Sequence, residues 1–108
     1  MLFHRQKTGT VEGTGAAISV SLGFQPKIVK LWNIDGNSSA LVVRLEWNET
    51  MGSGKGVKTI SGKDATTDTV SLMTFISSGG ITASYGGFSI GTDSDVNVNG
   101  KTIIWEAV

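Results

Sequence analysis

The sequence predicts an all-β fold, namely a single-domain antiparallel β-sandwich or jelly-roll-like barrel. Apolar residues alternate with polar ones or come in short runs, and they do not recur at helical spacing over any long window. The chain has 15 glycines among 108 residues, and serine and threonine are abundant, which suits short strands joined by tight turns. Turn signals recur about every 8–12 residues, as they do in small sandwiches and barrels.

The clearest element is a hairpin in the first half of the chain. Lys27–Ile34 is a β-branched and aromatic segment, and Asp35–Ser38 is a turn signal because Asp-Gly and Gly-Asn tolerate positive φ. In the return strand, Ser39–Asn48, alternate residues are apolar over a long stretch. One face carries Leu41, Val43, Leu45 and Trp47, and the other carries Val42, Arg44, Glu46 and Asn48.

The remaining strands are shorter and are separated by glycine-rich turns. Glu49–Gly56 is expected to be a mobile loop, and Asn99-Gly100 is expected to join Val98 and Ile103 as a hairpin turn. Turns are also predicted at Ser61–Asp64 and Ser77–Gly80. The further strands are expected at Leu2–Thr8, Ala17–Leu22, Val57–Ile60, Thr69–Ile76, Ile81–Tyr85, Gly87–Ile90 and Lys101–Val108, with Ile103, Trp105 and Ala107 on one face of the last.

The length fits one domain with one modest core. We expect residues 16–108 to form this domain, and residues 1–15 to form either an arm that orders on a neighbouring molecule or an edge strand. There is no cysteine, so disulfides and thiolate metal sites are excluded within these residues.

The charge balance argues against nucleic acid as a partner. Nine basic and nine acidic residues give a formal net charge of +0, and no long basic run appears. No stretch approaches the roughly 18 apolar residues of a membrane-spanning helix. The first ten residues lack the apolar core of a signal peptide.

One motif matches a calcium-binding loop. Asp95, Asn97, Asn99 and Gly100, followed after five residues by Glu106, fit the EF-hand pattern of alternating oxygen ligands and a final glutamate. An EF-hand loop lies between two helices, whereas strands are expected here. A looser cation site at Asp93 and Asp95 stays open beside a solvated Asp/Asn edge, and we assign no metal ligand and no cofactor.

No catalytic constellation emerges, so we expect no enzyme and assign no catalytic residue. Gly100-Lys101-Thr102 has the ending of a phosphate-binding loop but lacks the earlier glycine. His4 is the only histidine, and no nucleophile-elbow motif accompanies it. Glu46 and Glu49 flank Trp47 like glycosidase carboxylates, but a chain this small rarely forms the deep cleft such enzymes need.

The three tryptophans, Trp32, Trp47 and Trp105, lie in expected strands. Packing in a core or an interface is the ordinary role of such residues, and an exposed carbohydrate-binding platform is the alternative. The residues we single out for interaction are Leu2, Phe3, His4 and Arg5 at the N-terminus, with Trp32 and Trp47 in the hairpin.

A set of turn and core patterns runs from Gly13 to the end of the chain. It comprises the segments Gly23–Lys27, Val29–Asn33, Leu45–Trp47, Met51-Gly52, Gly80–Thr82, Gly87–Asp93, Asp95–Gly100 and Trp105–Ala107. Taken in this order, these segments resemble small virion proteins of tailed bacteriophages and prophages, some of them head decoration (cement) proteins, and also modules of phage fibres.

The resemblance implies a non-enzymatic decoration protein that binds the outer surface of the capsid shell and stabilises it. Its partner would then be the major capsid protein, and it would form a homo-oligomer, for which we expect a trimer. It would be located in the virion, and in the host cytoplasm during assembly. The alternative is a tail-fibre or tail-tip module that binds a receptor, including a carbohydrate, in a pocket lined by aromatic residues.

Overall fold

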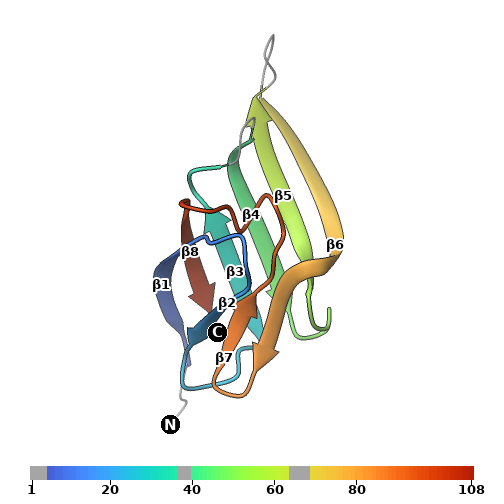
Figure 1. Ribbon diagram of the computed structural model, residues 1–108. Coiled ribbons are helices and arrows are strands. Elements are labelled where there is room, and N and C mark those ends of the chain that lie inside the picture. The colour runs from blue at the N-terminus through green and yellow to red at the C-terminus, as the bar shows by residue number, and fades with distance from the viewer. Residues whose placement is uncertain (1–4, 37–39, 64–68) are drawn as a thin grey trace.

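The computed structural model describes residues 5–36, 40–63 and 69–108, and within them it contains strands and no helix. The all-β prediction is therefore confirmed for this part of the chain (Figure 1). The strands are β1 (Lys7–Glu12), β2 (Ile18–Ser21), β3 (Ile28–Asn33), β4 (Ala40–Asn48), β5 (Lys55–Lys63), β6 (Thr69–Ser84), β7 (Gly87–Ile90) and β8 (Thr102–Ala107).

All eight strands belong to one antiparallel sheet, in the order β1-β8-β3-β4-β5-β6-β7-β2. The sheet curls, so that β7 and β2 lie in front of β3 and β8 (Figure 1). The molecule is elongated, with extents of 53 × 25 × 24 Å. A separate second sheet, as in a sandwich or jelly roll, is not confirmed, because the strand order is continuous.

The sheet curls at strand β6, because this strand pairs with β5 in one part of the sheet and with β7 in the other. Its first half pairs with β5, and its last residues, Ile81–Ser84, pair with β7. The register with β5 shifts so that Gly56 pairs with Ile76 while Lys55 pairs with Ile81. Residues 77–80 are extra at this point, and Gly79 has a φ of 78°, as in a bulge that bends a strand. The turn predicted at Ser77–Gly80 is therefore wrong: the chain bends there but does not reverse.

The predicted β3–β4 hairpin is confirmed where it is described. Val29, Leu31, Val43 and Leu45 are fully buried, whereas Arg44, Glu46 and Asn48 are only partly buried. The turn begins as expected at Asp35-Gly36, where Gly36 has a φ of 72°. Residues 37–39, and the side chains at positions 40 and 41, lie outside the described part. Alternation along β4 thus gives the sheet a packed concave face and an outer face.

The core lies inside the curl. Phe88 of β7 contacts Trp105 of β8 edge to face, with ring centroids 5.6 Å apart. The predicted alternation of β8 is confirmed, because Ile103, Trp105 and Ala107 are all buried. The other buried apolar residues are Leu22, Phe24, Val29, Leu31, Val43, Leu45, Trp47, Ile81, Ile90 and Val96.

The C-terminal hairpin prediction is wrong in part. The segment from Val96 to Val98 is a turn rather than a strand, and β8 pairs with β1 and β3 instead. The turn at Asn99-Gly100 is present, because the Lys101 N–H donates to the Val98 carbonyl (3.0 Å). The turn expected at Ser61–Asp64 is wrong over Ser61–Lys63, because β5 continues to Lys63, and Asp64 lies outside the described residues.

Candidate functional site

Two features of the described residues could carry function, an exposed sheet face and a buried polar cluster. We call the first the outer face, and it consists of the outward residues of β8, β3, β4, β5 and β6. One row across it, set by the register of neighbouring strands, places Trp32 between Ile104 and Arg44. Arg44 lies opposite Thr59, which in turn lies opposite Met73. The outer face is therefore a continuous surface across five strands.

The outer face is notably apolar for an exposed surface. Met73 is 69% exposed and Phe75 is 55% exposed, whereas Trp32 is half-buried among its neighbours. Smaller contributions come from Ile28, Val42 and Ile104, each exposed by between 36% and 41%. An apolar surface of this kind is typical of a protein that docks on a partner.

Two shallow depressions mark this face. Trp32, Val42, Arg44, Thr59 and Ser61 line the first. The second lies toward the other end of β3 and β4, and its lining includes Ile28, Lys30, Glu46, Met51, Val57 and Met73. The first combines an indole with guanidinium and hydroxyl groups, and the second is more apolar.

Charges on the outer face are arranged in pairs across and along the strands. Lys30 lies opposite Glu46 on one side and Glu106 on the other. Arg44 and Glu46 form an ion pair along β4, with Nε and Oε1 2.9 Å apart. Both side chains of that pair are more than 40% exposed, so solvent screening leaves it little effect on stability. These charges favour polar recognition at the margin of an apolar contact.

The residues singled out for interaction lie in different surroundings. Trp32 lies on the outer face, but Trp47 is a correction, because it is only 4% exposed and packs in the core. Its indole N–H donates to the Gly52 carbonyl (2.8 Å). Arg5 is exposed ahead of β1, and Leu2, Phe3 and His4 lie outside the described residues. Residues 7–12 of the N-terminal segment form the edge strand β1.

The loop predicted to be mobile, Glu49–Gly56, is shorter and is tied to the body of the protein. Besides the Trp47 contact, the Gly54 N–H donates to the Ile81 carbonyl (2.8 Å). The Gly80 N–H donates in return to the Gly54 carbonyl (2.9 Å). These bonds join the loop to the bend in β6.

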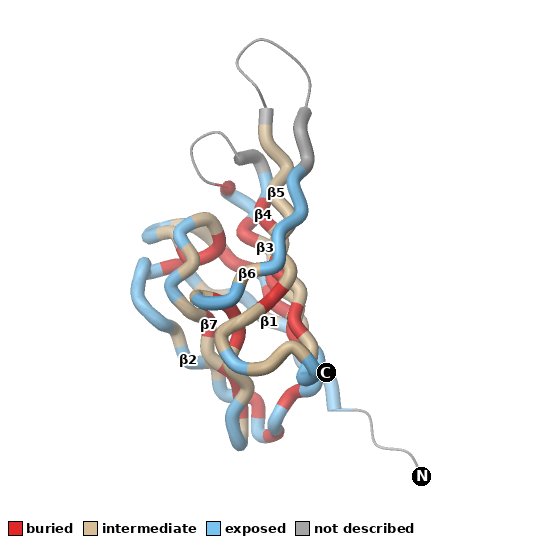
Figure 2. The backbone as a smooth tube through the Cα atoms, turned by 90° about the vertical axis from the view of Figure 1, so that its right-hand side faces the viewer, coloured by how far each residue is buried: buried red, intermediate tan, exposed pale blue. Residues whose placement is uncertain are grey.

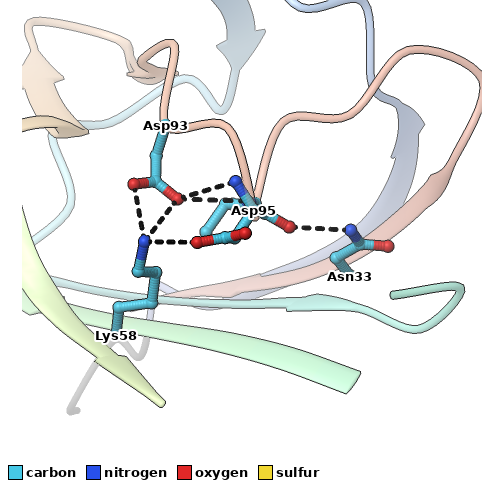
Figure 3. Close-up of polar contacts among 5 residues, drawn as sticks. Asn33, Lys58, Asp93 and Asp95 are labelled. Atoms are coloured by element: carbon cyan, nitrogen blue, oxygen red, sulfur yellow. Dashed lines mark hydrogen bonds and ion pairs between the residues drawn. The ribbon is translucent and has the colours of Figure 1, made fainter. Parts of the chain in front are cut away.

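The second feature is a polar cluster on the concave face of β5, formed by Lys58, Asp93 and Asp95 (Figure 3). The Lys58 ammonium lies 3.0 and 3.2 Å from the two Asp93 carboxylate oxygens and 2.7 Å from Asp95 Oδ2. The Lys58 side chain is only 12% exposed. Asp93 Oδ2 also accepts the N–H groups of Asp95 and Val96. The cluster therefore fastens the segment before β8 onto β5.

The electrostatics of the cluster favour the charged form of the lysine. Burial lowers the pKa of Lys58, but its hydrogen bonds to Asp95 and Asp93, together with their negative charges, raise that pKa by more. The net effect is a pKa above the ordinary value for lysine. The ammonium therefore stays protonated at neutral pH, which makes it a charge partner rather than a base.

Buried asparagines hold the same segment from other directions. The Asn33 amide donates to the carbonyls of Gly36 and Asp95 (3.0 and 2.9 Å). Asn97 Oδ1 accepts the N–H groups of Thr14 and Gly15, and its amide donates to the carbonyls of Ala16 and Gly91. Asn97 is 2% exposed, so the prediction of a solvated Asp/Asn edge is wrong at this position.

The calcium-loop pattern does not converge in the fold. Asp95 binds Lys58, Asn97 binds backbone groups, and Glu106 lies in β8 on the outer face. Within the described ranges, no group of three or more His, Cys, Asp or Glu residues could hold a metal ion. The positive charge beside Asp93 and Asp95 is the ammonium of Lys58.

Sequence reasoning missed the cluster because Lys58 is far from the two aspartates along the chain. The spacing of Asp93 and Asp95 was visible, but nothing in the sequence linked it to β5.

The described residues contain no helix long and apolar enough to span a membrane. Comparison of the chain with family models, with curated proteins and with solved structures finds no match.

Proposed function

We propose that this chain is a non-enzymatic structural protein of a tailed-phage particle that binds the outer surface of the capsid shell and stabilises it. The observation that carries the proposal beyond the sequence resemblance is the outer face, where Met73 and Phe75 are largely exposed on the same face as Trp32, with β4 and β5 between them. A broad, slightly curved apolar surface with charges at its margin suits docking on another folded protein.

The polar cluster supports a structural role over a catalytic one. Its ammonium is matched by two carboxylates, and the Asp93 carboxylate also accepts two backbone N–H groups. Groups committed in this way contribute to a rigid scaffold. In the same proposal, the curled sheet works as a two-layered, jelly-roll-like body, with β2 and β7 forming the second layer.

The major capsid protein is the proposed partner, and the chain would be present in many copies on the virion after assembly in the host cytoplasm. Each copy needs only a modest contact, because a shell that offers many equivalent sites holds linked copies by avidity.

The test is the number and position of copies in purified particles, measured by quantitative gel electrophoresis and cryo-electron microscopy. Hundreds of copies on the outer shell support the proposal, and a few copies at the tail contradict it.

A matched pair of variants then tests the outer face as the binding surface. Trp32→Ala combined with Met73→Ser is expected to weaken binding to shells lacking the protein at least tenfold. Tyr85→Ala, which changes a 99% exposed residue away from the outer face, is expected to leave binding unchanged.

The alternative function is receptor binding at a tail tip, and the first depression favours it. Trp32 beside Arg44, Thr59 and Ser61 offers an aromatic surface with polar groups, the combination that sugars contact. A glycan array screened with the purified protein, with Trp32→Ala as control, tests this reading. Saccharide binding lost in that variant, combined with tail location, would replace the capsid proposal.

A further inference from the structure

Strand β6 has an open edge over its first half, Thr69–Ile76. Among the described residues, this half pairs only with β5, because β7 pairs with β6 at Ile81–Ser84 alone. The backbone groups on the other side of Thr69–Ile76 therefore face away from the sheet. In Figure 1 this half of β6 forms the right-hand margin of the sheet, next to β5.

Large apolar side chains are exposed on both faces of this open half. Met73 and Phe75 point to the outer face, where they are 69% and 55% exposed. Leu72 lies on the opposite face and is 61% exposed. On β3 and β4, by contrast, the concave side is buried by the curl of the sheet. The pale blue tube along this part of β6 shows the difference (Figure 2).

The open half also lacks the features that normally prevent edge pairing. From Thr69 to Ser84 the strand contains no charged residue and no proline. The two strands at the ends of the sheet order are protected in ordinary ways, because β1 carries Lys7 and Glu12 and β2 has only four residues. A long, uncharged, apolar edge is a site where another strand is expected to add.

We infer that the open half of β6 pairs antiparallel with the same segment of a second copy, across a two-fold axis perpendicular to the sheet. Two copies close each other's edges, whereas a single strand added from a foreign protein would itself present a new open edge. The net charge of +0 and the uncharged segment mean that the copies do not repel each other.

The side chains are compatible with this symmetry. Antiparallel partners point to the same face of a sheet, so outer residues meet outer residues. With Thr74 on the axis, Phe75 lies opposite the second copy's Met73, and Leu72 lies opposite the second copy's Ile76. Each exposed apolar residue then gains an apolar neighbour, and the two outer faces join into one surface. This arrangement is complete with two copies, whereas the sequence led us to expect a trimer. The inference does not depend on the proposed capsid role.

The first test is sedimentation equilibrium of the full chain over a range of concentrations. A dimer is expected, and a monomer or a trimer as the only species would overturn the inference. Met73→Lys combined with Phe75→Lys sets like charges against each other and is expected to weaken dimerisation at least a hundredfold. Phe75→Lys combined with Met73→Glu sets opposite charges against each other and is expected to restore the dimer.

The matched control is Val42→Lys. Val42 is also an apolar residue of the outer face, and it is 38% exposed, but it lies in β4, away from the open edge of β6. This variant is expected to remain dimeric, and circular dichroism checks that every variant is folded. A double-lysine variant that is folded and still dimeric would overturn the inference. The inference would also be overturned if the wild-type chain were monomeric and a foreign protein bound along its β6 edge.

Cross-linking tests the register directly, because the chain contains no cysteine. Thr74→Cys places one thiol beside its copy across the axis and is expected to form an intermolecular disulfide rapidly under mild oxidation. Ser84→Cys, exposed at the far end of β6, is the control. Faster cross-linking of Ser84→Cys than of Thr74→Cys would overturn the arrangement.

Discussion

Phe88 and Trp105 meet edge to face, with an interplanar angle of 75°, although their strands are seventh and second in the order of the sheet. This contact closes the curl, because it brings β7 against β8. Gly9 of β1 makes room for it: a Cβ there would lie 2.6 Å from the indole of Trp105. The aromatic pair therefore lies at the centre of the core that fills the curl of the sheet.

Truncation of Phe88 is expected to destabilise the fold strongly. The side chain is 1% exposed, and replacing a buried phenylalanine with alanine leaves a cavity that costs about 3–5 kcal/mol. Urea unfolding of Phe88→Ala followed by tryptophan fluorescence gives the free energy of unfolding. Tyr85→Ala is the control, and an equal loss of stability in both variants would contradict the assigned core.

Removal of the Lys58 ammonium is expected to cost more than removal of an exposed lysine. Lys58→Met leaves Asp93 and Asp95 close together without a counter-charge, and breaking a buried pair in this way costs about 3–5 kcal/mol. Lys27→Met, at an exposed position, is the matched control. The unfolding free energies of the two variants decide the matter, and similar small losses would show that the cluster contributes little.

The same cluster predicts a loss of stability at alkaline pH. The folded-state pKa of Lys58 is raised, so its contribution is fully present below the unfolded-state pKa of about 10.4. That contribution is lost as the pH rises from there through the folded-state pKa. Unfolding free energies measured from pH 9 upward should therefore converge for wild type and Lys58→Met. A constant difference over that range would contradict the raised pKa.

Asn97 is expected to be far more sensitive to substitution than Asn99. Asn97→Ala removes the acceptor of the Thr14 and Gly15 N–H groups and the donor to the Gly91 carbonyl, whereas the Ala16 carbonyl keeps the Thr14 hydroxyl as a donor. Each lost hydrogen bond of this kind costs about 0.5–1.5 kcal/mol. Hydrogen exchange should show faster exchange at Thr14 and Gly15. Asn99→Ala, at an exposed turn position, should leave these rates unchanged.

Gly87 is expected to tolerate no side chain. A Cβ at Gly87 would lie 2.1 Å from the Val20 carbonyl oxygen, so Gly87→Ala forces β2 away from β7. Gly15→Ala is the comparison, because it carries only the cost of its positive φ of 80° and meets no neighbouring atom. Thermal unfolding should rank Gly87→Ala well below Gly15→Ala, and a reversed order would contradict the close approach of the two strands.

The sequence predicted the parts of the fold that depend on local pattern. Alternation along β3 and β4 identified which residues are buried, since a period of two specifies a face wherever one side packs. It misled at Val96, where a buried residue of a turn mimics one step of a strand. It also misled at Ser77–Gly80, because glycines that permit a turn equally permit a bulge.

The candidate surfaces were less accessible to sequence reasoning. Trp32 and Trp47 lie on opposite faces of neighbouring strands. Alternation within one strand does not give its register with the next strand, and which face is covered depends on how far the sheet curls. The exposure of Leu72 and Phe75 follows from the bend of β6 near Gly79, beyond which β7 begins to pair. Likewise, Lys58 meets Asp93 only because the chain returns to β5 after it has formed β6 and β7.

The single course of β6 through both parts of the sheet has a mechanical consequence. Its N-terminal half pairs with β5 outside the core, and its C-terminal half includes the buried Ile81 of the core. A force applied along β6 would load the β5–β6 ladder in shear, so that many hydrogen bonds resist together instead of rupturing one after another. Because the same strand continues into the core, tension along its first half is passed to the buried part of the sheet.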